Sequence, residues 1–411
     1  MKTKIIIFAI FNLLICNLLF GQSINGKLGT GGQFIIRDTN NTFLTLNQST
    51  GELSLSRSLL LPVTTQNSQV GSIFKGTVRF LHNFSPTVSS NTFLGLNSGN
   101  FTMNGVGSQS SYNTGIGANT LSQLTTGYEN SALGQSSMVS TTTGSGNSSF
   151  GSFSMFVNST GLQNSAFGNH SMYANTTGNL NSGFGTNALY GNQTGFQNTA
   201  VGHSSLEMNT GNYNTALGYN SGSTITTGAN LTCLGIDAAP TTPTALNQVT
   251  LGNTFVTSLR CNVQTITSLS DERDKKNITE LSLGLDFITK LHPRQFNWDK
   301  REWYDDNVSD GSKMTEAPTA GFIAQELDEV QQTAGADWLN LVLKDNPEKW
   351  EATYGNLLPV MVKAIQELKA ENDKLKDKLA KFEEMQIMLA GEISKMKYGN
   401  SSIKEIKMSE K

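Results

Sequence analysis

Cysteine and histidine are too scarce in this chain for a disulfide framework or a metal centre. The 411 residues include three cysteines, Cys16, Cys233 and Cys261, and four histidines. Cys16 falls in the N-terminal apolar run, and the other two show no metal-ligand spacing. We expect both to be small buried apolar side chains. The histidines are scattered along the chain, so we expect no metal and no cofactor: His82, His170, His203 and His292.

Charge is nearly absent from the first two thirds of the chain. Only eleven charged side chains lie between residues 22 and 260, out of 29 basic and 32 acidic residues in total. Neither this stretch nor the charge-rich residues 261–411 carry a basic stripe, so nucleic acid is not an expected partner. The contrast divides the chain into two regions of different physical character.

Long apolar runs are also missing, apart from one at the N-terminus. Lys2 and Lys4 precede the mostly apolar run from Ile5 to Phe20, and Gly21 follows. This order is typical of a secretory signal, which we place at residues 1–21. Asn12 and Asn17 interrupt the run, which argues against a permanent anchor. We therefore expect an exported protein, extracellular or at the cell surface, with no membrane span after signal removal.

What the middle of the chain does contain is a 17-residue repeat. An asparagine recurs at this spacing, shortening to 16 at the end, and a glycine follows four residues after each one. An apolar residue stands just before that glycine, and a second apolar residue stands eight after the asparagine. The asparagines are Asn113, Asn130, Asn147, Asn164, Asn181, Asn198, Asn214 and Asn230, and Asn91 begins a degenerate first copy.

The repeat predicts a β shaft over residues 91–252. One copy cannot bury a core, but stacked copies can. Glycine and asparagine suit the left-handed corners of such coils. We expect both apolar positions to face inward, in a β-solenoid or a trimeric β-stack; three chains would make the better core. The regular apolar placement argues against a disordered linker.

The C-terminal region predicts a small α+β domain that ends in a long coiled-coil helix. Residues 354–398 place apolar side chains at heptad spacing for more than five heptads. Asn372 at an a position can fix the register of such a bundle. The central residues of the expected trimer seam are Ile365, Leu368, Asn372, Leu375, Leu379 and Phe382.

The rest of the chain divides into four further segments. They are an N-terminal β segment (22–90), a connecting strand (253–269, with Phe255 to Val263 as its clearest part), the small domain (270–353) and a tail (399–411). Within the small domain we expect a helix over Leu281–Leu291, a strand over Gln295–Trp298 and a strand running into a helix over Gly321–Leu327.

A motif at the boundary of the two regions carries a family resemblance. Ser270-Asp271-x-Arg273-x-Lys275-x-x-Ile278 resembles the opening of the endosialidase-type intramolecular chaperones, a family of self-cleaving tail-spike peptidases. Pro293 with Phe296 and Trp298, the run Gly321–Glu326, and Tyr354 through Ile365 resemble later parts of that family. The repeats in turn resemble the heads of trimeric autotransporter adhesins and phage tail-fibre shafts, through cores such as Asn164-Ser165-Ala166-Phe167-Gly168.

The resemblance implies a domain that trimerises, guides folding of the fibre ahead of it and then cuts the chain. Ser270 would be the nucleophile, Lys275 its general base, and Leu269–Ser270 the cleaved bond, with Asp271, Arg273 and Ile278 as supporting motif residues. A serine hydroxyl needs a base, and a lysine serves only when desolvation or a neighbouring cation keeps it neutral. One turnover within one chain needs no external substrate.

Two alternatives stay open. In the first, the peptidase is inactive and the domain remains as a permanent trimer clamp. In the second, the shaft carries a glycan-active enzyme. The acids of the repeat region, Glu129, Glu207 and Asp237, share no repeat phase, whereas glycosidases need two neighbouring carboxylates. The expected partners are two further copies of the chain, with surface glycans or another surface as ligands of the shaft.

Overall fold

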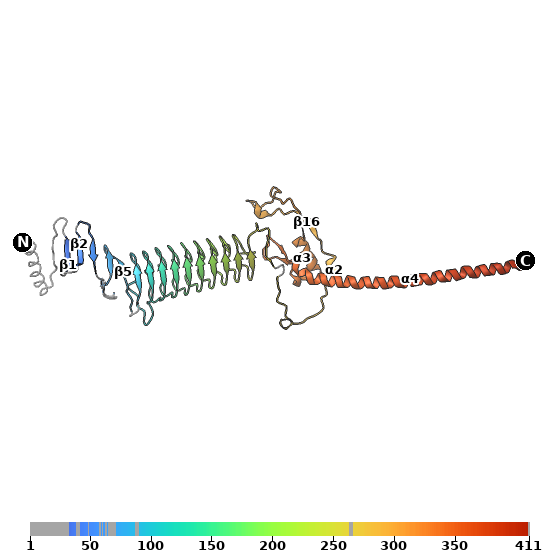
Figure 1. Ribbon diagram of the computed structural model, residues 1–411, viewed down its shortest axis with the longest axis horizontal. Helices are drawn as coiled ribbons and strands as arrows, with labels where there is room; N and C mark the ends of the chain where they lie inside the picture. Colours follow the sequence, from blue (N-terminus) through green and yellow to red (C-terminus); the bar gives the residue numbers. More distant parts are fainter. Residues whose placement is uncertain are drawn as a thin grey trace, which may run out of the picture.

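The chain forms a shaft, a small domain and a long helix, which follow one another along one axis (Figure 1). This computed structural model describes residues 33–37, 42–47, 49–56, 59, 61, 64, 71–86, 90–262 and 266–409, with side chains up to 397. The predicted signal, residues 1–21, lies outside the described residues. Within them, no helix is both long enough and apolar enough to cross a bilayer.

Short antiparallel strands precede the shaft. Strands β1 (Gln33–Arg37), β2 (Thr42–Asn47) and β3 (Leu53–Leu55) form one antiparallel sheet. Strands β4 (Ile73–Lys75) and β5 (Val78–His82) form a hairpin, and β5 pairs antiparallel with the first strand of the shaft. The hairpin therefore covers the open edge of the shaft sheet, as sheet edges require.

The shaft is a β-solenoid made by a single chain. Each turn contributes one three-residue strand, and successive strands pair in parallel, so that Ser165 lies beside Ser182, 17 residues later. The strands are β6 (Thr92–Leu94), β7 (Thr114–Ile116), β8 (Ser131–Leu133), β9 (Ser148–Phe150), β10 (Ser165–Phe167), β11 (Ser182–Phe184), β12 (Thr199–Val201), β13 (Thr215–Leu217), β14 (Thr232–Leu234) and β15 (Val249–Leu251).

Only one of the two predicted apolar positions faces the core. The residue eight after the asparagine, for example Met172, is fully buried, as is the middle residue of the strand, for example Ala166. The apolar residue before the glycine, for example Phe167, points outward instead. Neighbouring residues of a strand face opposite sides, so a buried middle residue turns the third one out. The expectation that both positions face inward is wrong.

Buried amides fill the space that apolar side chains leave. The side chain of Asn164 donates to Asn147 Oδ1 (3.1 Å) and to the carbonyl of Gly178 (2.8 Å), and its own Oδ1 accepts from the backbone N–H of Asn181 (3.0 Å). The same contacts recur in neighbouring coils, and these asparagines are buried. Such a ladder satisfies the polar groups that burial would otherwise penalise. One chain can therefore close its own core.

The small domain packs two short two-stranded sheets and two helices around Phe287, Leu327, Leu341 and Val360. Its strands are β16 (Arg294–Phe296), β17 (Thr319–Gly321), β18 (Val342–Leu343) and β19 (Glu351–Ala352). Its α-helices are α2 (Leu285–Ile288) and α3 (Ala324–Thr333), and its 3-10 helices are η1 (Glu272–Asp274), η2 (Arg301–Trp303), η3 (Asp337–Leu339) and η4 (Tyr354–Leu357). Helix α4 (Leu358–Ser409) follows directly.

Several local predictions differ from the structure. The expected connecting strand is not formed between 255 and 262, where the backbone has left the sheet and Phe255 and Leu259 are exposed; Val263 lies outside the described residues. Cys261, in the same segment, is exposed, whereas Cys233 is buried in the shaft as expected. The helix expected over Leu281–Leu291 spans only Leu285–Ile288. The expected tail is helical through Ser409.

Candidate functional site

The motif serine and lysine meet across one turn of 3-10 helix. Residues 270 and 275 flank η1, and the N–H of Lys275 donates to the carbonyl of Glu272 (3.0 Å), which bends the chain back on itself. As a result Lys275 Nζ lies 2.5 Å from Ser270 Oγ and 3.3 Å from the carbonyl oxygen of Ser270. This is hydrogen-bonding distance for a nucleophile and its base.

Asp271 and Arg273 stabilise that turn. Asp271 is the N-cap of η1, because its Oδ1 accepts from the backbone N–H of Arg273 (2.9 Å). The Arg273 guanidinium also pairs with the same carboxylate (Nη2 to Oδ2, 2.6 Å). These hydrogen bonds hold the pKa of Asp271 below its ordinary value and raise the pKa of Arg273. Both motif residues therefore act on the shape of the turn rather than on the serine itself.

In one chain the whole motif is open to solvent. Ser270 and Lys275 are exposed, Leu269 is 100% exposed and Ile278 is 65% exposed. Two apolar side chains thus flank the Ser–Lys pair with no cover from their own chain. Apolar groups left in water in this way favour burial against another surface.

The later motif residues contact one another in the small domain. Strands β16 and β17 pair antiparallel, with Arg294 opposite Gly321. Arg294 forms an ion pair with Glu326 (2.7 Å). The Tyr354 hydroxyl lies within hydrogen-bonding distance of both the N–H and the carbonyl of Phe322 (3.2 Å each). Segments that are distant in the sequence therefore support one another, which accounts for their appearance as one ordered set of motifs.

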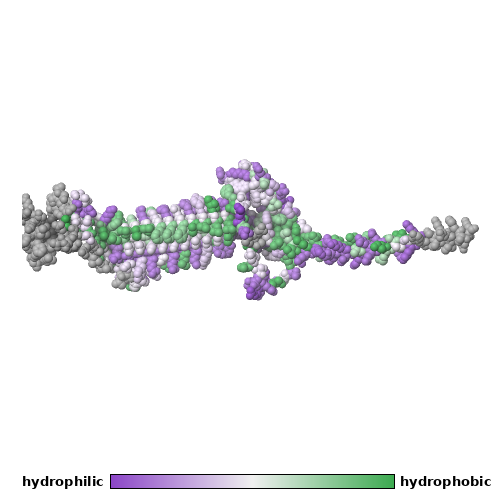
Figure 2. All heavy atoms as spheres, viewed as in Figure 1, coloured by the Kyte–Doolittle hydropathy of each residue, from purple (hydrophilic) through white to green (hydrophobic). Residues whose placement is uncertain are grey.

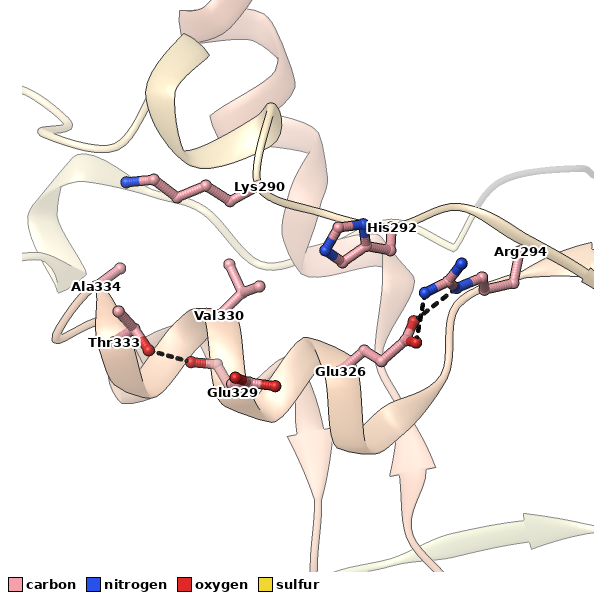
Figure 3. Close-up of a pocket in the computed structure, with 8 residues that line it drawn as sticks. All are labelled: Lys290, His292, Arg294, Glu326, Glu329, Val330, Thr333 and Ala334. Atoms are coloured by element: carbon pink, nitrogen blue, oxygen red, sulfur yellow. Dashed lines mark hydrogen bonds and ion pairs between the residues drawn. The ribbon is translucent and has the colours of Figure 1, made fainter.

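A hollow of about 480 Å³ beside this ion pair is another candidate site. Figure 3 shows Lys290, His292 and Arg294 facing α3 across it. Arg294 is bound to Glu326, and Lys290 is bound to Asp286 (2.6 Å), so both cations already have carboxylate partners. The described residues hold no group of three or more His, Cys, Asp or Glu that could bind a metal ion. The residues that line this hollow do not include a nucleophile in contact with a base, unlike the Ser270–Lys275 pair.

Helix α4 presents different side chains to its own domain and to solvent. Leu357 is buried just before the helix, and Val360 and Ala364 are buried within its first turns. Glu367 Oε2 accepts from the N–H of Leu285 (2.7 Å), which links α2 to α4. The heptad residues lie on another face. All six predicted seam residues are exposed in the single chain: Ile365, Leu368, Asn372, Leu375, Leu379 and Phe382.

The sequence gives no signal for the contacts between the last coil and the small domain. Asn346 Nδ2 donates to the carbonyl of Thr241 (3.2 Å), and Gln248 Nε2 donates to Asp345 (3.3 Å). Lys300 Nζ donates to the carbonyl of Thr254 (3.4 Å). These residues are polar, lie far apart in the sequence and follow no period, so pattern analysis has nothing to detect.

Comparison with protein families identifies the region that contains the Ser–Lys pair. Residues 270–336 match the family model described as chaperone of endosialidase. The match begins at the motif serine and ends beyond α3. The β-solenoid precedes it in the chain, which is the architecture that the sequence resemblance implies. No curated protein and no solved structure matches the chain.

Proposed function

We propose that the chain is an exported fibre protein whose C-terminal region is a self-cleaving intramolecular chaperone. That region brings three copies together, guides folding of the shaft and then cuts the Leu269–Ser270 bond. The observation that carries the proposal is the 2.5 Å contact between Lys275 Nζ and Ser270 Oγ at the first residue of the family match. The basic, apolar N-terminus supports export, and the polar shaft with few charges suits contact with surface glycans or another surface.

The chemistry uses two side chains of the protein and one water molecule. Neutral Lys275 accepts the Ser270 Oγ proton while Oγ attacks the carbonyl carbon of Leu269. The carbon–nitrogen bond then breaks, and the lysine ammonium returns its proton to the departing nitrogen. An ester joins Leu269 to Ser270 Oγ, and water hydrolyses it to a Leu269 carboxylate and a free Ser270. Each chain turns over once, because the two pieces are no longer linked.

Assembly supplies the condition that a single chain lacks. A lysine can accept a proton only where its amine is kept neutral, which requires desolvation or a neighbouring cation. Leu269 and Ile278 are exposed beside the pair, so a surface that covers them also removes water from Lys275. The seam residues of α4 and the family match support two further copies as that surface. Cutting therefore follows trimerisation.

Intact mass and a denaturing gel of residues 22–411 test the cut directly. We expect fragments 22–269 and 270–411 from the wild type, and an uncut chain from Ser270→Ala and Lys275→Met. Ser268→Ala is the matched control, because Ser268 is also exposed and lies two residues away; it should be cut like the wild type. A trimeric but uncut wild-type chain would contradict self-cleavage.

The permanent trimer clamp is the second candidate function. The exposure of Lys275 in the single chain favours it, because a lysine that stays hydrated on assembly gives no base. In that case the wild type and Ser270→Ala would both be uncut, full-length trimers. The experiment above therefore separates the two functions.

A further inference from the structure

An apolar column runs along the outer face of the shaft sheet. It consists of the third residue of each strand from β7 to β15, and Figure 2 shows it as a continuous band along the shaft. Each of these side chains is 36–52% exposed, although all nine are aliphatic or aromatic. The column is Ile116, Leu133, Phe150, Phe167, Phe184, Val201, Leu217, Leu234 and Leu251.

The column exposes more apolar surface than is usual for a soluble monomer. Its area is on the order of 700 Å², whereas the largest apolar patch of a typical soluble monomer is about 300–600 Å². No charged residue interrupts it. The row beside it, the first residue of each strand, is Ser or Thr from β7 to β14. An uncharged, flat and regular face of this kind indicates a contact surface.

The geometry of the rings selects against a sugar as the occupant. Phe150, Phe167 and Phe184 stack on one another with ring centroids 4.7 and 4.9 Å apart and planes within 5° and 7°. Each ring face is therefore covered by the next rung, and mainly ring edges point outward. A sugar packs against an open ring face, which this column does not offer.

We propose that this column is the surface by which the shafts of three copies pack against one another. The inference rests on the proposed trimer and assigns its contact in the shaft. A partner must offer apolar side chains at the spacing of the coils over nine rungs. Another copy of the same chain, parallel and in register, presents that spacing, whereas a non-repeating partner does not. Helix α4 continues along the axis of the shaft, so copies joined through α4 bring their shafts side by side (Figure 1).

The column lies entirely before Ser270. The contact it makes therefore belongs to the shaft and persists when the C-terminal region is removed. Two interfaces with different roles follow: α4 gathers the copies, and the column keeps the shafts together afterwards.

Disulfide trapping in residues 22–411, which do not include Cys16, tests the proposal. In a Ser270→Ala, Cys261→Ser background, Phe167→Cys should form disulfide-linked dimers on mild oxidation, because two of three cysteines near a shared axis can pair. Tyr190→Cys is the matched control: Tyr190 is 37% exposed and Phe167 36%, but Tyr190 lies in the turn segment after β11. It should stay monomeric on a denaturing gel. Leu217→Cys repeats the test three rungs further on.

Leu375→Cys in the α4 seam separates this proposal from the trimer itself. Dimers from Leu375→Cys but not from Phe167→Cys or Leu217→Cys would overturn the column as an interface and leave the trimer standing. Dimers from none of the three, together with a monomeric mass in solution, would overturn both. Equal linking of Phe167→Cys and Tyr190→Cys would indicate random collision and would also overturn the proposal.

Discussion

His82 is buried where the N-terminal hairpin meets the first coil, beside the rings of Phe93 and Phe101. Its Nδ1 accepts from the N–H of Phe84 (3.3 Å), so Nε2 carries the proton and donates to the carbonyl of Ser98 (2.7 Å). The pKa of His82 is lowered from 6.5 to about 4: burial is the main cause, the Ser98 hydrogen bond acts in the opposite direction, and the nearby Arg79 cation adds to the lowering. The neutral ring therefore belongs to the folded state.

Lowering the pH should destabilise the packing of the N-terminal hairpin on the first coil. The unfolded chain binds a proton at His82 below about pH 6.5, whereas the folded chain resists until about pH 4. The stability that the neutral ring contributes is thus complete above pH 6.5 and is lost as the pH falls towards 4, by up to about 3 kcal/mol. Hydrogen exchange of the β5 and β6 amides, corrected for the intrinsic effect of pH, measures it.

His82→Gln should abolish this pH dependence, because the amide does not titrate. The exposed His203 provides the control, and His203→Gln should keep the wild-type profile. A pH profile that is the same in all three proteins would rule out His82 as the responsive group.

At the scale of one element, the coils of the shaft depend on a column of glycines with positive φ. Gly168 has φ +139°, and a Cβ there would lie 2.5 Å from the carbonyl oxygen of Gly185 in the next coil. A backbone carbonyl cannot move aside to relieve this contact, as the flexible end of a side chain could. The close stacking of one coil on the next therefore requires the absence of a side chain at this position.

Gly168→Ala should destabilise the shaft by about 3 kcal/mol or more, because it combines backbone strain with a clash. Gly107→Ala is the control: Gly107 has φ +63° but open space around its Cβ position, so the cost should be about 1 kcal/mol. Thermal unfolding followed by circular dichroism compares the two. Equal losses would mean that strain alone, without the contact between coils, accounts for the effect.

At the scale of the whole molecule, the proposed trimer depends on the apolar seam of α4. Leu375→Glu would place three carboxylates in the seam of the proposed bundle, which costs several kcal/mol because buried like charges repel. Sedimentation at micromolar concentration should show a shift from trimer towards monomer. Lys376→Glu changes charge one residue away, outside the a and d positions, and should leave the trimer intact. Dissociation by both variants would point to charge alone rather than to the seam.

The sequence by itself determined which positions are equivalent. The 17-residue spacing predicted a stacked β shaft, the heptads predicted a long helix with an apolar seam, and the motif singled out Ser270 and Lys275, which the structure brings to 2.5 Å. Each of these depends on local spacing, which a linear pattern contains. The cleavage and the trimer remain proposals.

Only the tertiary structure decided which way equivalent residues point. Phe167 and its counterparts face outward because a strand alternates its sides, and a shift of one residue reverses every side chain. Buried amides such as Asn164 fill the core that sequence analysis assigned to apolar groups. The predicted strand at Phe255 failed because a strand needs a partner, and contacts such as Asn346 with Thr241 depend on where the chain returns. These are properties of the arrangement in space, and periodicity does not contain them.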